Sequence, residues 1–383
     1  MPEKRYLFTP GPTPVPPDVL AASAQPIVHH RGPDFRTTYG RCLERLRRVY
    51  RTDSDVLLFT SSGTGGLESV IENLCVPGDR VLAVTNGNFG ERWAEIARLH
   101  GCEVQRLDYE WGATPSVDDL TARLEETGGA KVVLITHSET STGVVADVQA
   151  LGTAAKAAGA LVAVDAVSSL GAVPLELDAW DLDAVVSGSQ KALMAPPGLA
   201  FVGVSTAAME AASQLPARGF YFDWRRTKAG QDALDAPVTP SVSLVTALDV
   251  ALGLLLEEGL EAAFERHVRL GRACRAGAKA MGLELFSPDE DRSAVVTALR
   301  VPDGVDAAAL LLDLRDRMGV QLIGGQRDLK GKIVRIGHIG YFDVFDITTA
   351  LAALELGLAE AGAEIERGVA VTAALEAFEH TKV

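Results

Sequence analysis

Short apolar runs alternate with helix-like segments through the first half of the chain, and this rhythm restricts the possible folds more than any other feature. The runs are VLLFT (56–60), RVLAVT (80–85), EVQRLDY (103–109), KVVLITH (131–137), ALVAVDA (160–166), AVVSGS (184–189) and LAFVGV (199–204). Strands that are apolar along most of their length are buried on both faces, and the intervening helices supply the covering layers. The sequence therefore predicts an α/β fold with a mostly parallel seven-stranded sheet and flanking helices.

The two ends of the chain depart from this rhythm. Closely spaced prolines within residues 1–17 predict an extended arm, because proline lacks the amide hydrogen that a helix interior needs. Beyond residue 241, a long apolar-rich segment predicts one helix from Val242 to Arg272. Further strands are expected at 295–301 and 332–337, and further helices at 35–50, 306–317, 343–361 and in the Ala-rich C-terminal tail. We therefore expect an N-terminal arm (1–17), a large α/β domain (18–260) and a smaller C-terminal α+β domain (261–383).

Charge and cysteine content argue against several classes of protein. The formal net charge is −15 and the pI is near 5.0, which argues against nucleic acids and anionic membranes as main partners. The four cysteines are scattered, so neither a metal site nor a disulfide scaffold is expected, and a reducing cytoplasm is the expected location. The longest uncharged stretch, 192–209, contains Pro196 and Pro197 and is expected to form a loop and a strand rather than a membrane helix.

One lysine and one aspartate lie at the ends of two successive apolar runs. Lys191 follows the run AVVSGS, and Asp165 lies near the end of ALVAVDA. Because open α/β sheets bind ligands at the carboxyl ends of their strands, both side chains are expected at one ligand-binding edge. Schiff-base chemistry requires a partly desolvated lysine amine, and a buried carboxylate keeps a pyridine nitrogen protonated. The pair indicates pyridoxal phosphate as cofactor; a surface lysine and an aspartate that caps the next helix are the alternatives.

Three polar loops follow other runs of the predicted sheet. TSSGTGGLE (60–68) joins a strand to a helix, and the free backbone N–H groups of such a loop suit a phosphate. In NGNFG (86–90), Phe89 lies close to glycines and is able to stack on a planar ring. In THSETSTG (136–143), the hydroxyl of Thr140 is a candidate contact for a ring oxygen. The respective alternatives are a helix-capping loop, a core phenylalanine beside a turn and an ordinary capped turn.

Taken in order, these segments resemble the class V aminotransferases, a family of fold-type I enzymes that depend on pyridoxal phosphate. The resemblance is greatest to the alanine–glyoxylate and serine–pyruvate aminotransferase group. It extends over nearly the whole chain through TPGPTPVPP, HHRGPDF, SSGTGGLE, NGNFGER, HSETSTGV, VDAVSSLG, SGSQKALMAPPGLA and VRIGHIG. Its most specific part is the SGSQKAL–APPG block downstream of VDAVSSLG. The resemblance implies the fold of these enzymes, their cofactor and a homodimer with a shared active site.

The resemblance also implies a role for each matching residue. Lys191 binds the cofactor covalently and moves the proton between substrate and cofactor, and Asp165 pairs with the pyridinium nitrogen. Arg335 binds the substrate α-carboxylate, with a structural ion pair as the alternative. The further cofactor contacts that it implies are Ser62, Gly63, Thr64, Phe89, Thr140 and Gln190.

The chain departs from the family pattern at two places. Phe89 stands where close relatives have a tryptophan. Relatives also close the phosphate site with residues of the partner subunit, for which Thr239 is the matching candidate here, although the expected tyrosine is absent. The preceding segment, 221–236, is charged and divergent, and side-chain specificity is expected to differ there.

The resemblance implies amino transfer by a ping-pong mechanism between small amino acids and 2-keto acids. We expect alanine or serine as donor and glyoxylate or pyruvate as acceptor, because Gly11 and Pro12 in the arm indicate a compact side-chain pocket. Aspartate, aminoethylphosphonate and ureidoglycine are the alternative donors. Residues 29–31 (His-His-Arg) are candidates for meeting an acidic substrate, with an interface role as the alternative.

Two other functions are compatible with the same fold. A lyase or cysteine desulfurase is one, but a desulfurase needs a nucleophilic cysteine on a mobile loop over the site, and none of the four cysteines lies in a comparable late loop. The other is an accessory subunit that binds pyridoxal phosphate without turnover, as in a related group associated with hydrogenases. Spectra recorded on mixing with amino acids separate the accessory role from amino transfer.

Overall fold

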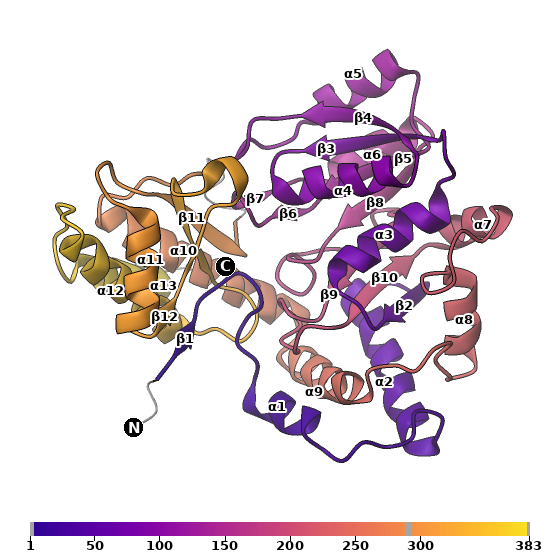
Figure 1. The fold of residues 1–383 in the computed structure, drawn as a ribbon, viewed down its shortest axis with the longest axis horizontal. Helices are drawn as coiled ribbons and strands as arrows, with labels where there is room; N and C mark the ends of the chain where they lie inside the picture. Colours follow the sequence, from indigo (N-terminus) through magenta and orange to yellow (C-terminus); the bar gives the residue numbers. More distant parts are fainter. Residues whose placement is uncertain (1–3, 288–292, 381–383) are drawn as a thin grey trace.

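A seven-stranded sheet forms the centre of the larger part of the molecule (Figure 1). The computed structural model describes residues 4–287 and 293–380. The strands, in spatial order, are β2 (Asp55–Phe59), β10 (Ala200–Val204), β9 (Ala184–Gly188), β8 (Leu161–Asp165), β5 (Val132–Thr136), β3 (Arg80–Thr85) and β4 (Glu103–Asp108). Each of the seven apolar runs coincides with one of these strands to within a residue or two, so the predicted sheet is confirmed.

Only β10 runs against the direction of the other strands. It pairs antiparallel with both β2 and β9, whereas β9, β8, β5, β3 and β4 pair in parallel. The short connection 189–199, which carries Lys191, explains this exception. A parallel neighbour needs a crossover of a dozen or more residues, and this connection is too short to supply one.

Helices cover both faces of the sheet because alternate strand side chains point to opposite sides. In β2, Val56 and Leu58 pack into one core and Leu57 and Phe59 into another. The first core is covered by α1 (Pro17–Ser23), α2 (Pro33–Tyr50), α5 (Val117–Thr127), α6 (Val148–Ala157) and α9 (Val242–Glu258). The second is covered by α3 (Gly63–Leu74), α4 (Asn88–Leu99), α7 (Thr206–Gln214) and α8 (Trp224–Asp232).

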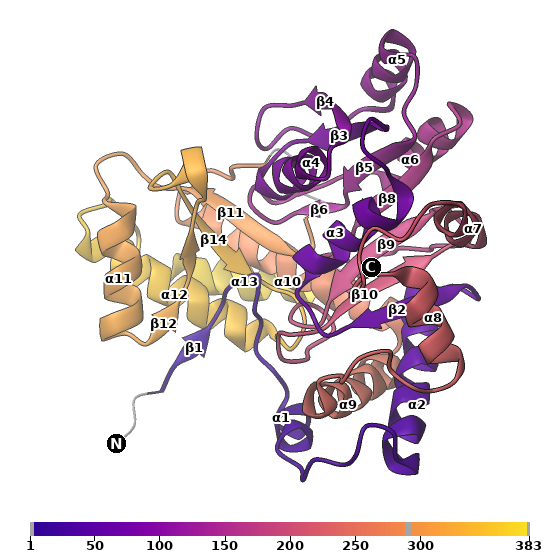
Figure 2. The same cartoon turned by 45° about the vertical axis from the view of Figure 1, so that its right-hand side comes forward.

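Apart from the short paired strands β6 (Ser138–Glu139) and β7 (Val144–Val145), the remaining elements pack around a core of their own beside the large sheet (Figure 2). They are α10 (Leu260–Ala280), β11 (Val296–Arg300), α11 (Ala307–Arg317), β12 (Val320–Gln321), β13 (Ile323–Gly324), a 3-10 turn (Arg327–Leu329), β14 (Ile333–Gly337), α12 (Val344–Glu360) and α13 (Val369–His380). The strands β11, β14 and β13 form an antiparallel sheet. The N-terminal strand β1 (Tyr6–Leu7) pairs with β12, so the arm joins this part before it enters the large one.

One prediction about local structure is wrong. The segment predicted as one helix forms two, α9 and α10, because Gly259 between them adopts a positive φ of 88° that a continuous helix does not allow. The described part of the predicted arm contains no helix before its last residue, Pro17, where α1 begins. Proline is tolerated in the first helical turn, where its missing N–H would have no partner. Residues 1–3 of the predicted arm lie outside the described residues.

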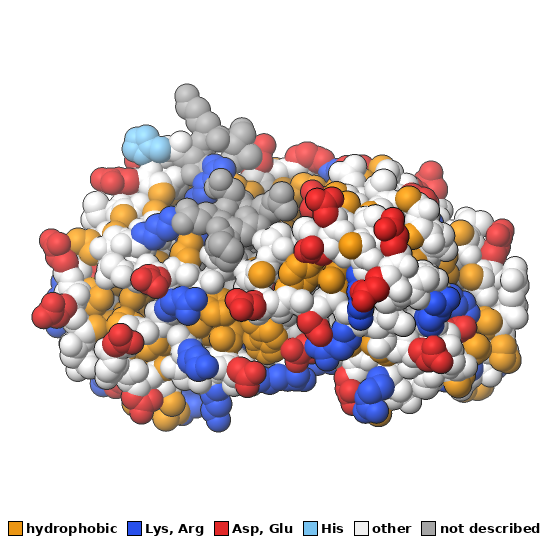
Figure 3. All heavy atoms as spheres, turned by 90° about the horizontal axis from the view of Figure 1, so that it is seen from above, with side chains coloured by type: hydrophobic (Ala, Val, Ile, Leu, Met, Phe, Trp, Pro, Cys, Tyr) orange, Lys and Arg blue, Asp and Glu red, His pale blue; other side chains and the backbone are white. Residues whose placement is uncertain are grey.

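The surface shows charges of both signs. On the face in Figure 3, acidic and basic side chains are interspersed among apolar ones. Among the described residues, no helix is both long and apolar enough to cross a membrane.

Candidate active site

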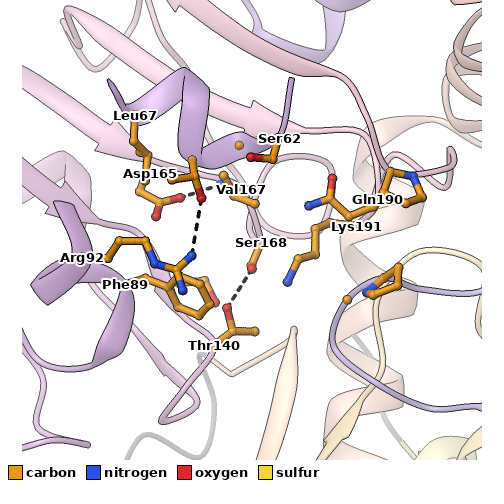
Figure 4. A pocket seen from close by; sticks show the side chains of 16 residues that line it. Ser62, Leu67, Phe89, Arg92, Thr140, Asp165, Val167, Ser168, Gln190 and Lys191 are labelled. Carbon is orange, nitrogen blue, oxygen red and sulfur yellow. Dashed lines mark hydrogen bonds between the residues drawn. The ribbon is translucent and has the colours of Figure 1, made fainter. Parts of the chain in front are cut away.

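The loops after β2, β3, β5, β8 and β9 converge with the N-terminal arm on one cavity of about 360 Å³ (Figure 4). These strands run in the same direction, so their carboxyl ends lie at one edge of the sheet. The sequence-predicted residues that line the cavity are Gly11, Ser62, Gly63, Thr64, Phe89, Thr140, Asp165, Gln190 and Lys191. Lys191 enters from one side, and Phe89 and Arg92 from the opposite side.

Lys191 is buried, unlike the surface lysine of the alternative interpretation, and the arm fixes its position. Its Nζ donates a hydrogen bond to the carbonyl of Pro10 at 2.7 Å, and Thr13 Oγ1 donates to the carbonyl of Lys191 at 3.1 Å. A Cβ on Gly11 would lie 2.3 Å from Lys191 Cε, and the φ of +147° at this position is one that residues with a side chain rarely adopt, so glycine suits it. Burial, assisted by the charge of Arg335, lowers the pKa of Lys191 to about 8. A neutral, nucleophilic amine is therefore accessible near neutral pH.

Asp165 ends β8 with its carboxylate in the same cavity. Burial raises its pKa to about 6, against the lowering effect of the hydrogen bond that Oδ1 accepts from the N–H of Val167 at 2.9 Å. The sequence alternative placed this carboxylate at the cap of a helix, but a turn follows Asp165. A buried carboxylate with this single local bond suits a cationic ligand group beside it.

The loop after β2 leads directly into α3, whose first residue is Gly63. Ser62 occupies the N-cap position without a side-chain bond to the helix. The N–H of Gly65 donates to the carbonyl of Ser62 at 2.9 Å, which leaves the N–H groups of Gly63 and Thr64 available for an anion. The cavity also contains Gln190 Oε1 and Ser138 Oγ, which are buried and without a hydrogen-bond partner in the described protein. Unpaired buried polar atoms cost about 1–3 kcal/mol each, which a polar ligand in this cavity offsets. The N–H groups at the start of α3 and the Ser138 hydroxyl are donors, and they fit a phosphate-bearing cofactor.

Phe89 and Thr140 bound the space where a planar ring fits. Phe89 lies in the first turn of α4 and is a lining residue, in contrast to the core phenylalanine of the alternative. Thr140 Oγ1 shares a hydrogen bond of 2.8 Å with Ser168 Oγ. Arg92, which the sequence reasoning missed, has its guanidinium 4.9 Å from the centroid of the Phe89 ring, and its Nη1 donates to Thr64 Oγ1 at 3.5 Å. Arg92 could have been found from the sequence, because residues three apart on a helix lie on the same face and Arg92 follows Phe89 by three.

Arg335 lies behind the cavity wall rather than in it. Its Nη1 donates to the carbonyl of Thr140 at 2.8 Å, and its Nε and Nη2 donate to the carbonyl of Gly324 at 3.1 and 2.7 Å. Arg335 forms no ion pair with any of the described residues (4–287 and 293–380), so the alternative of a structural ion pair is wrong. Burial lowers its pKa to about 10, which leaves the guanidinium charged at neutral pH.

Two other predicted contacts lie away from this cavity. Thr239 is exposed and does not line it. Within residues 29–31, both histidines are outside the lining set, and Arg31 is largely exposed and pairs with Asp235 at 3.5 Å. Within this one chain, therefore, neither segment contributes to the cavity.

Comparison with known proteins places this geometry in a family. The family model described as Aminotransferase class-V matches residues 5–337. A soluble hydrogenase 42 kDa subunit of Anabaena cylindrica is 41% identical over 99% of this chain and 100% of its own length. An L-aspartate–glyoxylate aminotransferase of Paracoccus denitrificans is 38% identical over 100% of this chain and 98% of its own.

A solved structure shows the same fold over the full length. The ureidoglycine–glyoxylate aminotransferase of Bacillus subtilis superposes with a TM-score of 0.93 at 32% identity, covering 99% of both chains. The resemblance read from the sequence motifs and the predicted fold type are thereby confirmed. The chain belongs to the class V aminotransferases, enzymes that transfer amino groups with pyridoxal phosphate as cofactor.

Proposed function

We propose that this enzyme transfers the amino group of alanine or serine to glyoxylate or pyruvate by a ping-pong mechanism. The observation that carries the proposal is the position of the arm against the lysine: Gly11 lies so close to Lys191 that even a Cβ would overlap it. Gly11 and Pro12 thus form a tight wall next to the reacting amine. Such a wall favours a donor with a small side chain.

The chain's own residues supply binding and proton transfer. Pyridoxal phosphate, when bound, withdraws electrons from the substrate Cα and so acidifies the proton there. Lys191 Nζ holds the cofactor and, once released, takes that proton and returns it on the cofactor side. Asp165 keeps the ring nitrogen protonated. The α3 N-terminus at Ser62–Thr64 and Gln190 bind the phosphate.

Thr140 and Phe89 are proposed to orient the ring, and Arg335 to bind the substrate carboxylate. Arg335 uses three of its N–H groups on carbonyl oxygens, which leaves one N–H on each terminal nitrogen for a carboxylate that approaches beside Thr140. We expect Arg335→Lys to raise the donor KM by about 100-fold with a smaller effect on kcat, since charge-assisted hydrogen bonds contribute roughly 1.5–3 kcal/mol each. Steady-state kinetics test this. Arg300→Lys, an exposed arginine on the neighbouring strand β11, is the matched control, and an unchanged KM in Arg335→Lys contradicts the assignment.

Covalent capture of the cofactor by the apoprotein is expected to depend on pH through Lys191. Only the neutral amine is nucleophilic, and burial lowers its pKa to about 8. The capture rate should therefore rise with pH up to about 8 and then level off. For an exposed lysine with a pKa of about 10.4, the capture rate would continue to rise up to about that pH. Rapid-mixing absorbance measurements across this range decide between the two. A rate that still rises steeply at about pH 10 contradicts the assignment.

A panel of half-reactions tests the donor. The holoenzyme is mixed with alanine, serine, aspartate, aminoethylphosphonate or ureidoglycine, and conversion of the cofactor to its amine form is followed by absorbance. Alanine or serine should react fastest. Aspartate is the second candidate, because Arg92 enters the cavity without a carboxylate partner in the described chain and the Paracoccus relative is an aspartate enzyme. A preference for aspartate that Arg92→Met abolishes would establish that alternative.

The accessory role is the other candidate, since a relative in Anabaena is named as a hydrogenase subunit. The presence of Lys191 and Asp165 in one cavity, with Arg335 behind its wall at the carbonyl of Thr140, favours turnover instead. In the same panel, an absorbance spectrum that no amino acid changes would establish the accessory role.

We further propose a cytoplasmic homodimer. Four free, buried cysteines suit a reducing compartment. Ile27 and Phe220 expose 76% and 59% of their surface, as apolar side chains at an interface would in a single chain. In the proposed dimer, Thr239 of one protomer reaches the phosphate of its partner. Light scattering tests the mass of the assembly.

A further inference from the structure

A buried glutamate lies directly behind the cavity. Glu139 is 0% exposed and stands between Ser138 and Thr140, both of which line the cavity, but it does not line the cavity itself. A buried carboxylate is costly unless several donors compensate for the lost water. Its environment therefore shows what the fold uses it for.

Four donors from two segments converge on this carboxylate. Oε2 accepts hydrogen bonds from the N–H groups of Phe89 at 2.9 Å and Gly90 at 3.1 Å. Oε1 accepts from the N–H of Ser141 at 3.0 Å and from its hydroxyl. Helix α4 has no side-chain cap of its own at Gly87, where a Cβ would lie 2.4 Å from Glu139 Cγ. Glu139 thus caps α4 from a strand that lies about fifty residues later in the sequence, and its charge complements the helix dipole.

The same charge lies among the ionisable groups of the site. Burial lowers the pKa of Arg335, and the negative charge of Glu139 acts in the opposite direction. The two residues are close in the structure, because Arg335 Nη1 donates to the carbonyl of Thr140, the residue after Glu139. The charges acting on Lys191 are Asp165 and Glu139, which favour its protonated form, and Arg335, which disfavours it. Burial raises the pKa of Glu139 itself, while its four hydrogen bonds lower it.

We propose that Glu139 is a positioning residue that ties the first turn of α4, with Phe89 and Arg92, to the Thr140 segment and provides the buried counter-charge for Arg335. The inference rests on the proposed roles of Phe89 and Arg335. It adds one carboxylate that holds the ring contact in place and offsets the buried positive charge of the carboxylate-binding arginine, without touching substrate or cofactor.

Glu139→Gln tests the proposal against a matched control. Glutamine keeps the shape but has one acceptor oxygen, so its NH₂ must face either the Phe89–Gly90 or the Ser141 donors. Glu355→Gln is the control, because Glu355 is also buried and also accepts from two N–H groups, of Gly368 at 2.6 Å and Ala370 at 3.3 Å, at the start of α13. Both variants should lower the Tm.

Only the Glu139 variant should alter the site. Loss of its negative charge disfavours a protonated Lys191 nitrogen, so the pH midpoint of the holoenzyme's visible absorbance should move to lower pH by roughly one unit. The donor KM should rise about 10-fold through Arg335. Glu139→Asp, which keeps the charge but shortens its reach, should raise KM and leave the midpoint in place. Ser141→Ala removes the hydroxyl that donates to Glu139 and accepts from the N–H of Asn88 at 2.9 Å, and should give a small KM increase.

Equal behaviour of Glu139→Gln and Glu355→Gln in midpoint and KM would overturn the proposal. Should Glu139→Gln not fold, an unchanged KM in both Glu139→Asp and Ser141→Ala would overturn it as well. Failure of the proposed function is recognised separately: the wild-type holoenzyme would then respond to no amino acid, while its pH midpoint, measured without substrate, would still report on Glu139.

Discussion

Lys191→Ala should lower kcat for amino transfer by on the order of 10⁴-fold, the largest effect that we expect from any single substitution. Proton transfer by a positioned side chain contributes about 10²–10⁴-fold, and the loss of covalent attachment of the cofactor adds to this. Among the residues described, Lys191 is the one lysine that lines the cavity. Steady-state kinetics with the preferred donor measure the loss, and absorbance spectra of the purified variant show whether the lysine–cofactor bond is absent.

The variant should still fold and bind the cofactor. The substitution removes one hydrogen bond, to the carbonyl of Pro10, together with a buried amine, and leaves the α3 N-terminus and Gln190 in place for the phosphate. A small primary amine added to the solution should restore part of the activity. Lys330→Ala, an exposed lysine far along the chain, serves as the control. Full turnover of Lys191→Ala with an unchanged spectrum would overturn the assignment.

Much of this site follows from features that one sequence displays locally. Each strand of the large sheet is a short apolar run, and a parallel arrangement brings the residues after the strands to one edge. Lys191, Asp165 and the Ser62–Thr64 loop were predictable for this reason, because their positions depend only on strand ends. The residues of the arm, such as Gly11, were predicted to belong to the site from the motif resemblance and not from a local sequence pattern.

The parts that escaped prediction depend on contacts between distant segments. In the sequence, Glu139 is one polar residue among several in a predicted turn. Its burial follows from the packing of α4 against it, which only the structure shows. Arg335 itself was implied by the resemblance, but its hydrogen bond to the carbonyl of Thr140, across the two parts of the molecule, was not predictable from the sequence. The break at Gly259 depends on a positive φ that an apolar helical pattern does not reveal, since glycine is tolerated within helices.

Asp165→Asn should lower kcat by about 10²–10³-fold, the range expected when one preorganised electrostatic contact of a catalytic site is lost. Asparagine has almost the same shape, but it carries no charge to keep the ring nitrogen protonated. The cofactor should also bind more weakly. Equilibrium binding of pyridoxal phosphate and steady-state kinetics measure the two effects, and retention of wild-type kcat would contradict the role of Asp165.

The stability of the apoprotein gives an independent and opposite signature. The pKa of Asp165 is raised from 3.8 to about 6, so the ionised carboxylate opposes folding by on the order of 3 kcal/mol above about pH 6, and this penalty disappears as the pH falls below about 4. Apo Asp165→Asn should therefore be more stable than wild type at pH 8 and gain little at pH 4.

Asp183→Asn provides the contrast. Asp183 is equally buried, but its carboxylate pairs with Lys156 at 3.0 Å and accepts from the N–H of Val162 at 2.7 Å, so that variant should lose stability at pH 8. Thermal unfolding of both apo variants tests the difference. If Asp165→Asn lost as much stability as Asp183→Asn, Asp165 would be a structural carboxylate. If Asp165→Asn gains stability and loses turnover, the Asp165 charge destabilises the folded apoprotein but is needed for catalysis. This combination is expected of a carboxylate placed to lie beside a cationic ring.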